Sequence, residues 1–175
     1  MRFEKLSSPL AAGALALKNR IVMPPMVVFT GGEDGSVTPA TLEHYRRSTG
    51  AGLVVVEATV VSPEGRLARE QLGIFEDRHV EGLARLADAI HRGGAAASIQ
   101  IHHAGRNTNT DATFGAPLLA PSAVAARDVV PLALDEAGIE RIVDCFAAAT
   151  RRAAAAGFDA VEIHGAHGYL VSQFL

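Results

Sequence analysis

The sequence lacks the residues and runs that mark several classes of protein. Its single cysteine, Cys145, excludes an intramolecular disulfide and any metal site built from several cysteines. No run approaches the roughly 18 apolar residues of a membrane span. Lys5 and Lys18 are the only lysines, and basic residues nowhere cluster beyond a pair. With a formal net charge of −3, the chain offers no surface typical of nucleic-acid or anionic-membrane binding.

The common phosphate-binding loops are also missing. No GxGxxG follows the first apolar run, and GxxxxGK[ST] does not occur. Gly31, Gly32 and Gly35 are better interpreted as a turn. The sequence therefore argues against a dinucleotide-binding Rossmann fold.

What is present is typical of a folded globular chain, with 49% hydrophobic and 20% charged residues. Its 175 residues can bury a sizeable core, but an α/β barrel typically needs about 250. The apolar stretch Leu10 to Leu17 follows Glu4 and Pro9 and precedes Lys18-Asn19-Arg20. Those flanks favour a terminal hairpin or capping strand over a signal peptide, so we expect a cytoplasmic protein.

Apolar runs and helical patterns alternate along the chain. Strands are predicted at Ile21–Met23, Leu53–Val56, Ala97–Ile101 and Ala160–Ile163. Helices are predicted from Thr38-Pro39 toward Gly50, from Val80 to Gly93-Gly94, from Asp135 to Gly157, and from Tyr169 onward. This β-α-β order predicts a parallel sheet, either a barrel or an open doubly wound sheet.

Polar side chains gather where the predicted strands end. The first strand runs into Pro24-Pro25-Met26, and the others end at Glu57-Ala58, at Gln100, His102 and His103, and at Glu162, His164 and His167. The carboxyl ends of parallel strands carry the site in both kinds of sheet, because they lie at one edge. We therefore expect a site at this edge.

The run from His164 to Tyr169 is the most informative segment. Two imidazoles, His164 and His167, and the phenol of Tyr169 can hydrogen-bond a substrate carbonyl and deliver a proton. A metal site needs a third protein ligand, for which His102, His103, Glu57 or Glu162 are candidates. No metal-binding motif in the sequence identifies which of them would be the third ligand, so we expect no metal.

Several segments together resemble the N-terminal half of the old yellow enzyme family, the FMN-dependent ene reductases or NADH:flavin oxidoreductases. They are Leu17 to Met26, Val56-Glu57-Ala58, Gln100 to Arg106, Ala120-Pro121-Ser122, Ala156 to Asp159, Glu162 to Leu170 and Gln173-Phe174-Leu175. The resemblance implies a (β/α)8 TIM-barrel fold, of which residues 1–175 hold the first four βα units behind a short N-terminal hairpin.

The resemblance also implies roles for individual residues. Pro24, Pro25 and Ala58 match positions whose backbone lies along the flavin ring, and Gln100 matches the side chain that bonds its pyrimidine edge. His164 and His167 match the pair that binds the carbonyl oxygen of an α,β-unsaturated substrate. Tyr169 matches the phenol that protonates the α-carbon. The expected cofactor is FMN with NAD(P)H as reductant, and the expected partner is a small-molecule enone.

Val27 departs from the family pattern, because relatives usually place Thr or Cys there, near the flavin O4. A valine cannot donate that hydrogen bond, so we expect a lower flavin potential. In such barrels the phosphate site is commonly built after strands 7–8, and the residue that meets the flavin N1–O2 edge also lies beyond Leu175. We expect weak FMN binding at best.

Four interpretations of the chain stay open. The leading one is part of an FMN-dependent reductase of α,β-unsaturated carbonyl compounds, which needs the missing C-terminal half-barrel or self-association to complete its core. Within the family, a 2,4-dienoyl-CoA-reductase-like enzyme with a downstream iron–sulfur cluster is the variant. The others are an inactive or self-associating half-barrel without cofactor, and a metal-dependent barrel hydrolase that uses His164 and His167.

Overall fold

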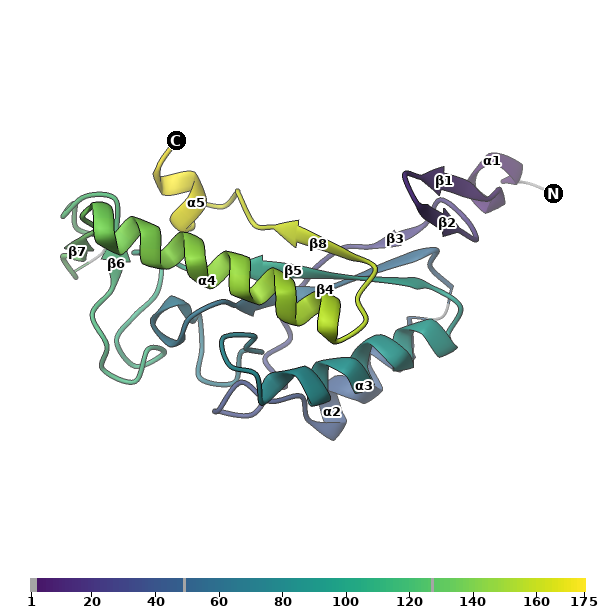
Figure 1. Cartoon of the computed structure of the whole chain (residues 1–175), viewed down its shortest axis with the longest axis horizontal. Coiled ribbons are helices and arrows are strands. Elements are labelled where there is room, and N and C mark those ends of the chain that lie inside the picture. Colours follow the sequence, from purple (N-terminus) through teal and green to yellow (C-terminus); the bar gives the residue numbers. More distant parts are fainter. Residues whose placement is uncertain (1–2, 49, 127) are drawn as a thin grey trace.

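The computed structural model describes residues 3–48, 50–126 and 128–175 (Figure 1). Its helices are α1 (Glu4–Ser7), α2 (Pro39–Arg46), α3 (His79–Arg92), α4 (Glu136–Ala155) and α5 (Leu170–Gln173), with a 3-10 turn at Pro63–Gly65. Its strands are β1 (Leu10–Ala12), β2 (Leu15–Leu17), β3 (Val22–Met23), β4 (Leu53–Val60), β5 (Ala96–His102), β6 (Leu119–Ala120), β7 (Leu132–Ala133) and β8 (Ala160–Ile163).

A parallel sheet in the order β3-β4-β5-β8 forms the centre of the fold. Each of its strands lies on one of the apolar runs that predicted a strand. The spatial order follows the chain order, with a helix after each strand. An open doubly wound sheet reverses its strand order at a switch point, whereas a (β/α)8 barrel does not. The topology therefore selects the barrel type from the two folds that the sequence left open.

The start of α2 and both ends of α4 lie within two residues of the residues that predicted them, whereas α2 ends at Arg46, before the expected limit at Gly50. Thr38 caps α2, its side chain accepting from the Thr41 amide, and Asp135 caps α4 by accepting from the Gly138 amide at 2.8 Å. Gly157 follows α4 with a φ of +85°, the left-handed conformation common after a helix. In the described ranges no helix combines the length and apolar character that crossing a membrane requires.

The hydrophobic core lies between the sheet and the helices α2, α3 and α4, which run along one side of it in Figure 1. Val54 and Val56 of β4 and Ile99 and Ile101 of β5 are fully or almost fully buried in this layer. Cys145 packs against the same core from α4, as its place on an apolar helix face indicated. Ser98, Gln100 and His102 alternate with these apolar residues and therefore face the other side of the sheet.

The predicted N-terminal hairpin is present as the antiparallel pair β1–β2, in which Leu10 pairs with Leu17. Figure 1 places it beyond the amino ends of the sheet strands, whereas α5 and the pair β6–β7 lie beyond the carboxyl ends. Lys18 ties the hairpin to the end of α3 by donating to the carbonyl of Gly93 at 2.9 Å. The hairpin therefore covers the end of the sheet opposite the predicted site.

Two features differ from the sequence expectation. β4 continues to Val60 rather than ending at Glu57-Ala58, because its register with β5 shifts between Val56 and Thr59. Such a bulge keeps pairing on both sides while redirecting the residues within it. The short parallel pair β6–β7 lies between β5 and α4, in a stretch where no strand was predicted.

Candidate active site

One cavity of about 360 Å³ collects the side chains that the sequence singled out. It is lined by Pro24, Pro25, Met26, Val27, Ala58, Leu67, Gln100, His164, His167 and Tyr169. The lining includes every residue that we expected to touch cofactor or substrate. Leu67 was missed, because it lies in a long loop with no periodic pattern to mark it.

The sheet explains why residues so far apart in sequence meet. The segment 24–27 leaves the end of β3, Ala58 lies in the bulge of β4, Gln100 is near the end of β5, and residues 164–169 follow β8. Because the strands are parallel, all four contributions lie at the same edge. The cavity therefore has an apolar wall from β3 and β4 and a polar wall from β5 and β8.

Glu57 holds the apolar wall in place. Its side chain is 1% exposed, and its Oε2 accepts from the Val28 amide at 3.1 Å. The Tyr45 hydroxyl accepts from the Glu57 amide at 2.8 Å and donates to its Oε1 at 3.4 Å. Burial raises the pKa of Glu57. The carboxyl group thus fixes the backbone beside Val27 from behind the cavity.

Gln100 is held from the neighbouring strand. Its Nε2 donates to Glu162 Oε1 at 2.6 Å, since the two residues are register partners of β5 and β8. This bond occupies one amide hydrogen and leaves the carbonyl oxygen and the second hydrogen to bind a ligand. Glu162, a candidate metal ligand in the sequence, is instead the partner that orients Gln100.

His164, His167 and Tyr169 form one aromatic cluster. The ring centroids of His164 and His167 are 5.2 Å apart, those of His164 and Tyr169 4.9 Å, and those of His167 and Tyr169 6.4 Å. All three pairs are close to perpendicular, with interplanar angles of 81°, 86° and 84°. Two imidazoles and a phenol therefore meet on one wall of the cavity.

The protonation state of His164 follows from its surroundings. Its Nδ1 accepts from the Ala166 amide at 3.3 Å, which assigns the ring hydrogen of the neutral form to Nε2. Burial, followed by the nearby His167, lowers the pKa of His164. The neutral imidazole is therefore favoured near pH 7, and its Nε2–H is a hydrogen-bond donor.

His102 and His103, which the sequence offered as candidate metal ligands, lie in other surroundings. His102 is 0% exposed, its ring lies 4.6 Å from that of Tyr169, and burial lowers its pKa to about 3. His103 accepts from the Gly105 amide through Nδ1 at 3.0 Å. Across residues 3–48, 50–126 and 128–175, no group of three or more His, Cys, Asp or Glu side chains is placed to hold a metal ion.

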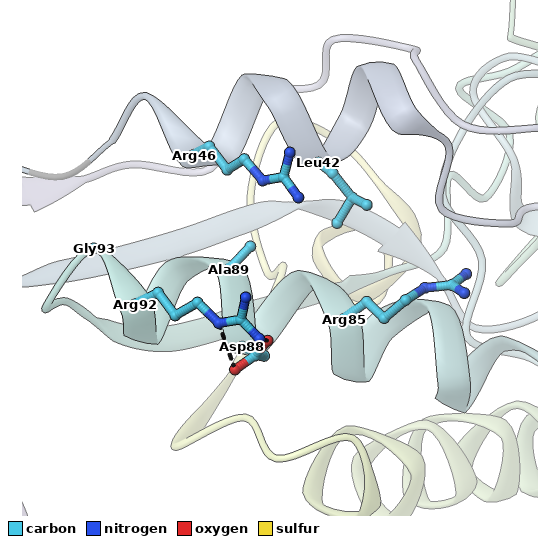
Figure 2. Close-up of a pocket in the computed structure, with 7 residues that line it drawn as sticks. All are labelled: Leu42, Arg46, Arg85, Asp88, Ala89, Arg92 and Gly93. Carbon is cyan, nitrogen blue, oxygen red and sulfur yellow. Dashed lines mark hydrogen bonds and ion pairs between the residues drawn. The ribbon is translucent and has the colours of Figure 1, made fainter.

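A second cavity, of about 440 Å³, lies between α2 and α3 on the outer layer of the fold (Figure 2). Arg46, Arg85 and Arg92 line it, and Arg92 is paired there with Asp88 at 2.6 Å. Arg85 pairs with Glu81 at 3.3 Å. None of the residues expected to form the site lies in this groove.

Residues 5–175 match the family described as NADH:flavin oxidoreductase / NADH oxidase. The chain belongs to this family. An NADPH dehydrogenase of Halalkalibacterium halodurans is 43% identical over 175 residues, covering 98% of this chain and 51% of the relative. An NADPH dehydrogenase of Bacillus subtilis is 40% identical over 176 residues, with coverages of 98% and 51%. The chain thus spans about half the length of these flavin oxidoreductase relatives.

Solved structures of the flavin oxidoreductase family agree with the barrel topology. Morphinone reductase superposes with a TM-score of 0.90 at 32% identity, covering 97% of this chain and 50% of that one. The old yellow enzyme homologue of Zymomonas mobilis gives a TM-score of 0.88 at 34% identity, with coverages of 95% and 50%. Another morphinone reductase structure is a complex with tetrahydroNAD. The fold is that of half a (β/α)8 barrel.

Proposed function

We propose that this chain carries the substrate wall and part of the flavin bed of an FMN-dependent NAD(P)H oxidoreductase that reduces the C=C bond of α,β-unsaturated carbonyl compounds. The observation that carries the proposal is the single cavity in which an apolar wall faces a paired imidazole and a phenol. Residues 1–175 are, in this proposal, the N-terminal half of an FMN-binding barrel domain.

The cavity has the chemistry that FMN requires of its ring site. Pro24, Pro25 and Val27 offer an apolar surface, and the small side chain of Ala58 lets a flat ring approach the β4 bulge. The free hydrogen-bonding groups of Gln100 suit the polar edge of that ring. FMN bound there supplies the transfer of hydride from NAD(P)H to the β-carbon of the alkene.

The chain's own residues polarise the substrate and supply its proton. Nε2–H of His164 donates to the substrate carbonyl oxygen, and His167, whose ring centroid is 5.2 Å from that of His164, offers a second donor. Two donors stabilise the negative charge that develops on this oxygen. Tyr169 O–H lies beside both rings and delivers a proton to the α-carbon.

The two edges of the central sheet suggest how the core is completed. Val22 on β3 is 47% exposed and Ile163 on β8 is 61% exposed, and neither strand has an outer partner in the described part of the chain. Since the relatives are about twice as long, the C-terminal half-barrel is the favoured cover for both edges, with self-association as the alternative. Cytoplasmic location stays a prediction.

The colour and chemistry of the purified protein test the proposal. Supplied with excess FMN to offset weak binding, the protein is expected to be yellow, to release FMN on denaturation, to bleach with NADPH under nitrogen and to regain colour when 2-cyclohexenone is added. The His164→Ala variant is expected to bleach normally but to lose most enone turnover. A colourless protein that takes up no FMN would favour the half-barrel without cofactor, and stoichiometric zinc would favour the hydrolase. Unaltered turnover in the variant would refute the role of His164.

A further inference from the structure

The loop that carries His167 and Tyr169 has an unusual backbone. His167 and Gly168 are consecutive left-handed residues, with φ of +57° and +69°. The left-handed region is unfavourable for a residue with a side chain, so neighbouring contacts must hold His167 there. This turn sets the direction in which the His167 and Tyr169 side chains leave the backbone.

Two amide side chains meet at the Gly168 carbonyl. Asn107 donates to it through Nδ2 at 2.7 Å, and Gln173 donates to it through Nε2 at 2.6 Å. An alanine Cβ at position 168 would lie 2.8 Å from Asn107 Nδ2, so the approach of Asn107 requires the glycine. The carbonyl of the left-handed residue is therefore fixed from two sides.

Gln173 also binds the loop that follows β5. Its Nε2 donates to the Ala104 carbonyl at 3.2 Å, and its Oε1 accepts from the Arg106 amide at 3.2 Å. Gly105 lies between these two partners, and a Cβ there would meet the Gln173 amide. One side chain thus joins the loop after β5 to the loop after β8.

These bonds are not those of an ordinary helix cap. A cap satisfies the free amide groups of its own helix, whereas Gln173 on α5 reaches partners that are 67 and 69 residues earlier in the chain. The backbone amide of Leu170, in α5, also joins the two loops by donating to the His103 carbonyl at 3.0 Å. The junction therefore belongs to the tertiary structure of the site.

We propose that Gln173, together with Asn107, is a positioning residue that holds the His167–Gly168 turn so that the His167 and Tyr169 rings face His164. The consequence for catalysis rests on the proposed function, whereas the positioning itself does not. Gln173 does not line the cavity, so it acts on the reaction only through the loop that it holds.

Two substitutions in the 175-residue chain test this proposal. Gln173→Glu keeps the acceptor for the Arg106 amide but replaces the group that donates to Gly168 and Ala104. Asn107→Asp replaces the other donor to Gly168, on a residue that is exposed. Asn109→Asp is the matched control, because Asn109 uses its Oδ1 as an acceptor from the Ala112 amide at 2.9 Å and an aspartate keeps that bond.

The primary readout is NMR of the chain itself. In Gln173→Glu and Asn107→Asp we expect loss of the nuclear Overhauser effects between the His164 and Tyr169 rings and about tenfold faster exchange of the Leu170 amide. Asn109→Asp should match the wild type in both. Ring contacts that persist in both test variants would overturn the proposal, even if the amide exchanged faster.

Enone turnover of FMN-loaded protein is the second readout. The two test variants should lose at least about tenfold in turnover while binding FMN as the wild type does, since neither residue lines the cavity. Variants that lose the ring contacts and keep full turnover would overturn the catalytic consequence. If no variant, including the wild type, turned over enone, the proposed function would fail and the NMR result would still decide the positioning role.

Discussion

Single residues determine how each wall of the cavity is held. Glu57 fixes the Val28 backbone from behind the apolar wall, and Glu162 orients the Gln100 amide on the polar wall. The sequence shows that both residues are carboxylates, but it does not show which groups they bind. The contact of Gln100 with Glu162 depends on the register of β5 against β8, which no local pattern encodes.

Glu57 gives the fold a dependence on pH. Burial raises its pKa above the ordinary 4.5, so the folded chain binds this proton more tightly than the unfolded chain does. The stability that this proton contributes is complete below about pH 4.5 and is lost as pH rises through the raised pKa. In Glu57→Gln we expect a free energy of unfolding that falls less over this range. Urea unfolding at a series of pH values measures it, and identical pH dependence in both proteins would contradict the assignment.

Val27 provides a test of the apolar wall. A threonine there could donate to the flavin O4, and one hydrogen bond is worth about 1 kcal/mol, or roughly 20 mV for a two-electron couple. We expect Val27→Thr to raise the flavin midpoint potential by about that amount in a redox titration. Val28→Thr is the control, because its side chain does not line the cavity. An unchanged midpoint potential in Val27→Thr would contradict a position of residue 27 beside the flavin O4.

Strands and helices are the scale at which the sequence predicts best. The apolar runs placed β3, β4, β5 and β8, and capping residues such as Thr38 and Asp135 placed the helix starts. These signals are local, so they can be interpreted without knowledge of the tertiary fold. The bulge between Val56 and Thr59 was missed because it arises from pairing with a distant strand.

The end of α4 offers a test of local backbone conformation. Gly157 has a φ of +85°, and a Cβ added there meets nothing within 4 Å, so only the backbone conformation opposes a side chain. We expect Gly157→Ala to lower the free energy of unfolding by about 1 kcal/mol. Gly157→Asn should cost less, because asparagine tolerates the left-handed region. Thermal unfolding of both variants checks this, and equal costs would argue against a conformational origin.

At the scale of the whole molecule, the chain is half of a barrel with the candidate site at one end. The strand order and the coverage of about 50% of the solved relatives agree on this. The sequence indicated the same half through its motifs and its length. It could not show that the eight expected site residues share one cavity, because that follows from the convergence of four strand ends.

The second cavity, between α2 and α3, is the competing site for a phosphorylated ligand (Figure 2). Arg46, Arg85 and Arg92 could attract the phosphate of FMN without any role for the strand ends. A binding measurement must therefore separate the two locations.

Titration of the 175-residue chain with FMN, followed by flavin fluorescence, separates them. We expect weak but saturable binding that Gln100→Leu reduces about tenfold, because one hydrogen bond to the ring edge is lost. Arg46→Ala, in the second cavity between α2 and α3, should leave the affinity for FMN unchanged. Binding that never saturates, or that depends on Arg46 and not on Gln100, would contradict a flavin site at the carboxyl ends of the strands.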